Sequence, residues 1–170
     1  SNTENDFTAQ TGTTNINYSV YDGSGWSEPT VIENVGEVTR LTTDGENIIY
    51  KKGGSLYSVA VSEGTATELG YSGIGQYTVD RFNGKTVLAY FNGNNDLIFV
   101  DDLLGSPSST TVTSDANVNS IPVIASNEND IYIGWTDHSN GYDNFCGARY
   151  SNGEWSDKIT FVDGDSNITA

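Results

Sequence analysis

Short runs rich in Val, Ile, Thr, Tyr and Phe alternate with clusters of Gly, Asn, Asp and Ser along the whole chain. Such runs are typical of β-strands, and the dipeptides Asp22-Gly23, Asp44-Gly45 and Asn83-Gly84 are typical of tight hairpin turns. Apolar residues do not recur at helical spacing, and no apolar run approaches the roughly 18 residues that a membrane-spanning helix needs. The pattern therefore predicts an all-β chain without membrane insertion.

A repeat underlies this pattern, because a polar turn leads into an apolar strand at four places. The anchor residues are Phe7, Ile48, Val87 and Ile131, at spacings of 41, 39 and 44 residues. A four-stranded propeller blade occupies about 40 to 45 residues. Each interval is therefore predicted to hold one blade, with strands at 37–43, 47–51, 55–61 and 65–69, at 76–82, 86–91, 96–101 and 110–113, and at 119–126, 130–136, 144–150 and 154–161.

The two ends of the chain predict how the blades are arranged. The sequence begins near the second strand of a blade, at 6–10, and Asn167–Ala170 looks like the first strand of one. We therefore expect a single four-bladed β-propeller domain over residues 1–170, whose C-terminal strand completes the N-terminal blade and leaves no open edge. Its blades are 1–34 plus 164–170, 35–70, 71–113 and 114–163.

A rival arrangement stays open at this point. The four blades could be part of a larger propeller, or could pair with a second chain to form a bigger ring. The chain is expected to be a monomer if the ring closes on itself and a dimer if it does not.

Two matching segments, 19–27 and 149–156, both read as a strand, a Gly turn and then Trp-Ser. They resemble the strand-turn-Trp segments of sialidase-like bacterial surface propellers, whose Asp-box has the pattern Ser/Thr-x-Asp-x-Gly-x-x-Trp. Here Asp22 lies four residues before Trp26 instead of five, and Asn152 stands in the place of an Asp before Trp155. The resemblance implies a propeller fold and a structural turn, and it transfers no catalytic residue.

The charge of the chain limits its partners. Seven basic residues against twenty-three acidic ones give a net charge of −16, which repels phosphate backbones, so no nucleic acid partner is expected. Methionine is absent, so we expect a processed or excised part of a longer protein. The single cysteine, Cys146, allows no intrachain disulfide and is expected to be a small buried residue. These features together favour a secreted or cell-surface bacterial protein.

The sequence argues against an enzyme. A sialidase places three arginines around a substrate carboxylate, whereas Arg40, Arg81 and Arg149 lie on strands that are not expected to converge. Equivalent inner positions show no paired carboxylates for glycoside hydrolysis, and His138 has no neighbouring nucleophile pattern. A non-catalytic chain is therefore predicted, with a fragment of a sialidase-like glycosidase as a remaining alternative.

A ligand site is predicted in the loop that follows Trp135. The Trp135 ring could stack on a sugar while Asp137, His138 and Tyr142 bind its hydroxyls. The alternative is that Trp135 packs between blades and that the loop is merely solvated.

Two other loops carry oxygen ligands at alternate positions. Asp163, Asp165 and Asn167 form one set, and Asp115 and Asn117 form the other. Calcium takes six to eight such oxygens, so a Ca²⁺ site is a possible cofactor site here. Plain turns are the alternative, because Asp, Asn and Gly are common turn residues and neither loop has a bidentate Glu.

The resulting functional hypothesis is a non-catalytic binding or adhesion module of a secreted or surface protein, with a carbohydrate or a surface protein bound on the loop face. A structural spacer or scaffold propeller is the first alternative.

Overall fold

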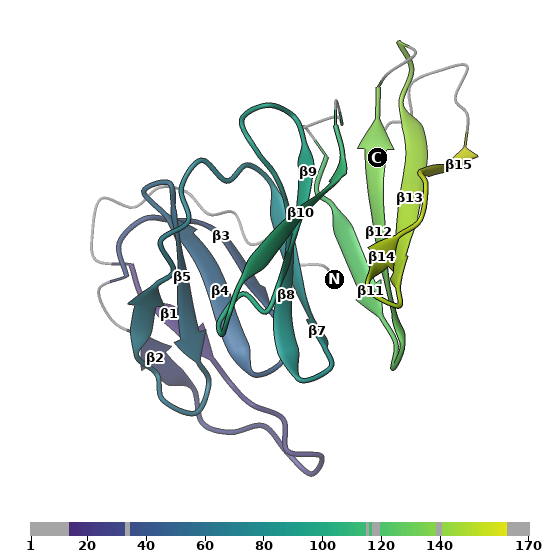
Figure 1. Ribbon diagram of the computed structural model, residues 1–170. Helices are drawn as coiled ribbons and strands as arrows, with labels where there is room; N and C mark the ends of the chain where they lie inside the picture. The colour runs from purple at the N-terminus through teal and green to yellow at the C-terminus, as the bar shows by residue number, and fades with distance from the viewer. Residues whose placement is uncertain (1–13, 33–34, 115, 117–119, 139–140, 163–170) are drawn as a thin grey trace, which may run out of the picture.

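The computed structural model describes residues 14–32, 35–114, 116, 120–138 and 141–162 (Figure 1). Within these ranges the chain forms fifteen β-strands and no helix. No helix long and apolar enough to cross a membrane is found in this described part of the chain.

The strands form four antiparallel sheets, three of which are meanders of consecutive strands. Sheet 1 contains β1 (Ile16–Tyr18) and β2 (Thr30–Ile32). Sheet 2 contains β3 (Val38–Thr43), β4 (Asn47–Lys52), β5 (Ser55–Ala60) and β6 (Ala66–Glu68). Sheet 3 contains β7 (Tyr77–Phe82), β8 (Lys85–Phe91), β9 (Leu97–Asp101) and β10 (Ser108–Thr113). Sheet 4 contains β11 (Val123–Ser126), β12 (Asp130–Asp137), β13 (Asn144–Ser151), β14 (Glu154–Trp155) and β15 (Ile159–Val162).

The four sheets stack in chain order, and sheets 1 and 4 lie at opposite ends of the row (Figure 1). The first strands of sheets 2, 3 and 4 lie next to one another, since β7 contacts both β3 and β11. Such a row of four-stranded meanders, with their first strands adjacent, is the arrangement of propeller blades. The predicted all-β, propeller-like fold is confirmed. Strand 6–10 and the strand at Asn167–Ala170, on which ring closure depends, lie outside the described residues.

Each pair of neighbouring sheets encloses its own apolar core. Sheets 1 and 2 meet around Ile16, Ile48 and Tyr50. The core between sheets 2 and 3 contains Ile49, Leu56, Leu88 and Val100 among others, and the core between sheets 3 and 4 contains Val87, Phe91, Phe99, Ile131 and Trp135 among others. The molecule is therefore held together by sheet-on-sheet packing rather than by one central core.

The repeat anchors do not all face the same way, which corrects the predicted alignment of Val87 with Ile48 and Ile131. Ile48 and Ile131 pack against the preceding sheet, whereas Val87 packs against the following one. The reason is the hairpin before each anchor. In sheets 2 and 4, four residues lie between the last paired residues of the first two strands. In sheet 3 only two residues, Asn83 and Gly84, lie between the paired Phe82 and Lys85, and they have φ values of 50° and 75°. Because the two turns differ in length, the anchor residue after the turn faces one side of the sheet in sheets 2 and 4 and the other side in sheet 3.

The predicted strands of sheets 2 to 4 mostly agree with the observed ones to within one or two residues at each end. Two are exceptions: in place of the predicted strand at 119–126 the observed one begins at Val123, and the predicted strand at 154–161 is two strands. Trp155 pairs with Tyr150, but Thr160 then pairs with Cys146 after an interruption. Lys158 lies in this break, and its side chain reaches Asp137 of β12.

Candidate functional site

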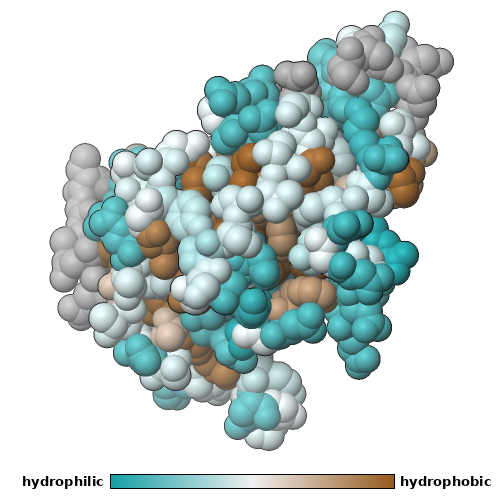
Figure 2. Space-filling model, viewed as in Figure 1, coloured by the Kyte–Doolittle hydropathy of each residue, from teal (hydrophilic) through white to brown (hydrophobic). Residues whose placement is uncertain are grey.

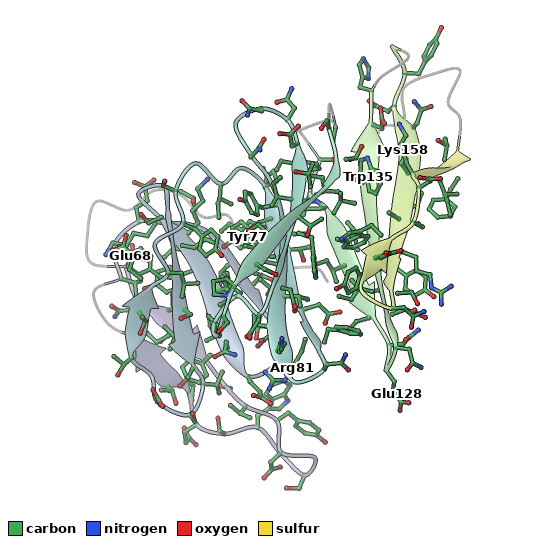
Figure 3. All side chains as sticks on the ribbon, in the orientation of Figure 1. Glu68, Tyr77, Arg81, Glu128, Trp135 and Lys158 are labelled. Carbon is green, nitrogen blue, oxygen red and sulfur yellow. The ribbon has the colours of Figure 1, made fainter. Side chains whose placement is uncertain are left out.

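The two ends of the sheets have different structures. The loop end carries the connection from β12 to β13, where the sequence predicted a ligand site. The turn end carries the hairpin turns near residues 45, 84, 128 and 152. In Figure 3, Trp135 and Lys158 lie toward the loop end of sheet 4, and Glu128 lies at the tip of its turn end.

Trp135 does not form a binding platform. Its side chain is 2% exposed and belongs to the core between sheets 3 and 4. Residues alternate between the two faces of a strand, so Trp135 continues the buried side that Ile131 and Ile133 begin. A ring enclosed in this way cannot stack on a sugar, and the alternative packing role is the one that the structure shows.

Asp137 is also buried, on the same face of β12. The ammonium of Lys158 donates a hydrogen bond of 2.5 Å to Oδ2 of Asp137. This hydrogen bond raises the pKa of Lys158, although partial burial opposes it. The predicted ligand role of Asp137 is therefore replaced by an internal ion pair that anchors the break between β14 and β15 to β12.

The other two predicted ligand residues lie at the surface. His138 is exposed, and its Nδ1 lies 2.8 Å from Oδ1 of Asp143. The Tyr142 side chain is exposed as well. The structure thus brings His138 and Tyr142 to the loop end but leaves them without the aromatic platform that the predicted sugar site required.

The predicted calcium ligands Asp115, Asn117, Asp163, Asp165 and Asn167 lie outside the described residues. Among the residues that are described, no group of three or more His, Cys, Asp or Glu side chains is placed to hold a metal ion. The calcium site stays a prediction.

The three arginines each have a separate structural partner. Arg40 donates from Nε to the carbonyl of Tyr77 at 2.8 Å, and Arg81 pairs with Glu46 at 2.8 Å. Arg149 contacts both carboxylate oxygens of its partner, Asp130, at 3.0 and 2.9 Å. The three lie on three different strands, β3, β7 and β13, and within the described part of the chain no residue contacts more than one of the guanidinium groups.

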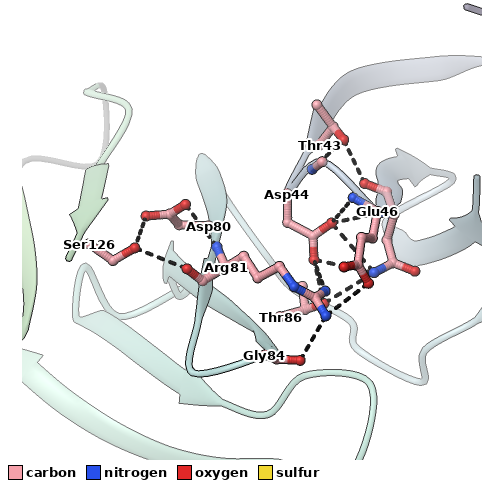
Figure 4. A network of polar contacts seen from close by, with 10 residues as sticks. Thr43, Asp44, Glu46, Asp80, Arg81, Gly84, Thr86 and Ser126 are labelled. Atoms are coloured by element: carbon pink, nitrogen blue, oxygen red, sulfur yellow. Dashed lines mark hydrogen bonds and ion pairs between the residues drawn. The ribbon is translucent and has the colours of Figure 1, made fainter. Parts of the chain in front are cut away.

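The turn end is joined across the sheets by polar contacts (Figure 4). The Asp44 carboxylate accepts hydrogen bonds from the backbone amide of Asn47 at 2.7 Å and from the Thr86 hydroxyl of the next sheet at 2.5 Å. Burial acts to raise the pKa of Asp44, but these hydrogen bonds outweigh it and hold the pKa below its usual range. Further along, Ser126 of sheet 4 donates to Oδ2 of Asp80 at 2.7 Å. The turns of sheets 2, 3 and 4 are thereby held in fixed relative positions.

A hollow of about 340 Å³ lies between the turn ends of sheets 3 and 4. Two half-buried aromatic residues, Phe82 and Tyr150, contribute to its wall. The remaining lining residues are polar or glycine: Asn83, Lys85, Asp101, Glu128, Asn129, Asn152 and Gly153. Lys85 lies between two carboxylates, 3.7 Å from Asp101 and 3.6 Å from Asp102. The hollow can therefore offer amide, carboxylate and ammonium groups beside aromatic rings.

This hollow was not among the sites predicted from the sequence. Its only local signal was the recurrence of Asn at hairpin tips, at positions 83, 129 and 152. The recurrence of Asn does not by itself indicate a site, because Asn is common in turns at positive φ. Asn83 and Asn152 have such φ values, 50° and 54°. Which tips lie together is decided by the stacking of two sheets, which is not a local property.

No protein-family model matches this chain, and no curated protein does. Two solved structures are similar to it. One is a complex of a yeast (S. cerevisiae) Dbp5 variant bound to Nup159, a Gle1 variant, IP6 and ADP, with 16% identity over 78% of this chain and 32% of the matched chain, at a TM-score of 0.48. The other is the N-terminal domain of Nup159, with 15% identity over 83% of this chain and 34% of that chain, also at 0.48. The chain spans about a third of their length, and a likeness this low identifies no family.

Proposed function

We propose that this chain is a non-catalytic binding module of a secreted or cell-surface protein, and that it holds a carbohydrate in the hollow at the turn end of sheets 3 and 4. The observation that carries the proposal is the composition of that hollow, where Tyr150 and Phe82 lie beside amide and carboxylate side chains. Sugars are bound by this combination, because their C–H faces pack on aromatic rings while their hydroxyls exchange hydrogen bonds with polar groups.

The size and the support of the hollow suit a small ligand. Its volume of about 340 Å³ lies near the lower end of the roughly 300 to 1,000 Å³ usual for ligand pockets. Sheets 3 and 4, whose hairpins carry most of the lining side chains, are joined near these turns by the Asp80–Ser126 hydrogen bond. The hairpin of sheet 3 is in turn held to sheet 2 by the Asp44–Thr86 hydrogen bond. Because these turns are already fixed, a ligand pays little to order them.

This location differs from the loop face that the sequence favoured. Of the four residues predicted to bind a ligand at the loop end, Trp135 and Asp137 are buried, and His138 and Tyr142 are exposed. A protein-binding or scaffold role is the second candidate, and the observation that favours it is the exposed apolar side of sheet 4, treated below.

A glycan array followed by calorimetric titration of the best glycan tests the proposal. Glu128 and Asn129 are exposed lining residues, so Glu128→Ala and Asn129→Ala should leave the fold intact. Each is expected to weaken binding by about tenfold, the effect of losing one to two kcal/mol of hydrogen bonding to a buried sugar.

Glu63→Ala is the matched control, because Glu63 is exposed and does not line the hollow. It should leave the affinity unchanged. If no glycan of a broad array bound, or if binding were unchanged in both Glu128→Ala and Asn129→Ala, the hollow would not be a sugar site.

A further inference from the structure

Sheet 4 has one side that sheet 3 covers and a second side that no other described strand covers. Ile131, Ile133 and Trp135 of β12, with Cys146 and Ala148 of β13, are buried against sheet 3. The residues between them point the opposite way, and sheet 4 is the last described sheet of the row (Figure 1). This second side, which we call the outer face of sheet 4, is the subject of the inference.

Large apolar side chains gather on the outer face. They come from four strands and are exposed by 41 to 60%: Val123, Tyr132, Phe145, Ile159 and Phe161. An apolar area is visible in Figure 2 on the flank of the molecule where β15 lies. Single exposed apolar residues are ordinary, but five on one side of one sheet mark an interaction surface.

The outer face is shaped to be flat. Gly134 and Gly147 lie opposite each other on β12 and β13. A Cβ at Gly134 would lie 3.1 Å from the Phe145 ring, and a Cβ at Gly147 would lie 2.6 Å from the Phe161 ring. The two rings therefore lie down over the glycines, with centroids 5.5 Å apart, and form a continuous apolar layer.

The face is also unusual in its charge. The chain carries a net charge of −16, yet the only acidic residue at the outward positions of β11, β12, β13 and β15 is Asp130. Arg149 neutralises it through contacts of 2.9 and 3.0 Å. Two exposed carboxylates lie at the margin of the face: Glu154 on β14, which pairs with Ser151, and Asp157, two residues before β15. The centre of the face, on these four strands, therefore carries no unpaired carboxylate, so two copies of an acidic chain can meet there without direct repulsion.

We infer that the outer face of sheet 4 docks onto the same face of a second copy of this chain. The contact would be a further sheet-on-sheet packing, like those between sheets 1 and 2, 2 and 3, and 3 and 4, but with two equivalent faces in contact. A two-fold dimer places one patch against itself, and the neutral, apolar character of this patch makes it self-complementary. The inference does not depend on the sugar site, which lies at the turn end of the sheets.

The opposite end of the row is a weaker candidate for this contact. Its described strands, β1 and β2, have three residues each, and Val31 is their one outward apolar residue with an exposed side chain. Further exposed apolar residues, Val20, Tyr21 and Trp26, lie in the connection between β1 and β2 and not on the strands, so the sheet itself offers less apolar surface here than sheet 4 does.

The first test is the mass of the unmodified chain, measured by light scattering after size exclusion over a dilution series. We expect a dimer that dissociates on dilution. Phe161→Asp and Val123→Asp each place a charge at a 60% exposed position of the face and should give monomers. Circular dichroism should show that both variants keep the β-sheet spectrum.

Leu104→Asp is the control, because Leu104 is exposed in the connection between β9 and β10 of sheet 3 and is not part of the outer face of sheet 4. It should keep the dimer. A single-chain mass for the unmodified protein at every concentration would overturn the inference, and so would a dimer that survives both face variants, since it would use another surface.

A distance measurement gives an independent readout. Cys146 is the only cysteine and is 1% exposed, so a spin label can be directed to Ala125→Cys at the edge of the outer face. A face-to-face dimer brings the two labels into the range of double electron–electron resonance. A dimer without a measurable distance between labels would contradict the proposed geometry.

Discussion

The hydroxyl of Thr86 donates a hydrogen bond of 2.5 Å to the Asp44 carboxylate across the boundary between sheets 2 and 3. Thr86 is 3% exposed, and the Asp44 carboxylate is enclosed as well. Arg81 approaches the same carboxylate at 3.7 Å. A hairpin turn of one sheet is thus fixed by a strand of the next, so local turn geometry and sheet stacking depend on the same side chain.

Replacement of Asp44 should therefore destabilise the protein. Asp44→Ala removes the acceptor for Thr86, for Asn47 and for the Glu46 amide. Hydrogen bonds to a charged group contribute about 1.5 to 3 kcal/mol, so we expect a loss of about 2 kcal/mol in the free energy of unfolding. Urea unfolding followed by circular dichroism measures it.

Glu46→Ala is the matched control. Glu46 pairs with Arg81 at 2.8 Å, but its side chain is largely exposed. Exposed ion pairs contribute little, so the cost should stay below about 1 kcal/mol. If Asp44→Ala and Glu46→Ala lowered the free energy of unfolding equally, the burial of the Asp44 carboxylate would not strengthen its hydrogen bonds.

The same carboxylate predicts a dependence of stability on pH. The pKa of Asp44 is held below its usual range in the folded chain, whereas in the unfolded chain it is about 3.9. The folded state thus binds this proton less tightly. The stabilisation is fully present above the unfolded pKa and is lost as the pH falls through the lower folded pKa.

Urea titrations from neutral pH downward should therefore show the free energy of unfolding decreasing below about pH 4. In Asp44→Asn this decrease should be smaller, because one of the depressed carboxyls is gone. An identical pH profile in the two proteins would contradict the assignment. Asp130, whose pKa is lowered chiefly by the hydrogen bond from Arg149, contributes in the same direction in both.

The strands of this fold could be predicted because their signals are local. Turn dipeptides and alternating apolar residues placed β3 to β9 within one or two residues of their observed bounds. The side to which a strand turns is a finer property. Val87 faces away from the side that Ile48 uses, because a two-residue turn precedes it and a shift of one position reverses every side chain.

The candidate site could be predicted only in part. Trp135 was predicted as a ligand residue because a polar loop follows it, with packing as the alternative. The alternation of buried residues along β12 puts its indole on the same side as Ile131 and Ile133. Burial of Asp137 depends on Lys158, 21 residues away, and no local pattern announces such a pair. The turn-end hollow and the outer face of sheet 4 likewise exist only after the sheets have stacked.

Substitution of Trp135 separates packing from binding. Trp135→Ala leaves a cavity in the core between sheets 3 and 4, and large-to-small changes of this kind cost about 3 to 5 kcal/mol. His138→Ala removes only a partly exposed pair with Asp143 and should cost less than about 1 kcal/mol. Thermal and urea unfolding measure both. A Trp135→Ala protein of unchanged stability would show that the indole is not a packing residue.

Gly75 gives the sharpest test of how the chain enters sheet 3. Its amide donates to the Phe91 carbonyl at 2.8 Å, and a Cβ added there would lie 2.9 Å from the same oxygen. The backbone must shift to admit a methyl group, so Gly75→Ala should cost about 1 to 3 kcal/mol. Gly93 lies two residues after Phe91, the last residue of β8, and a Cβ added there would have no neighbour within 4 Å. Gly93→Ala should stay within about 0.5 kcal/mol of the original stability. Equal effects at the two positions would mean that the approach of Gly75 to Phe91 is not tight, and that the loop before β7 can move away from β8 without loss.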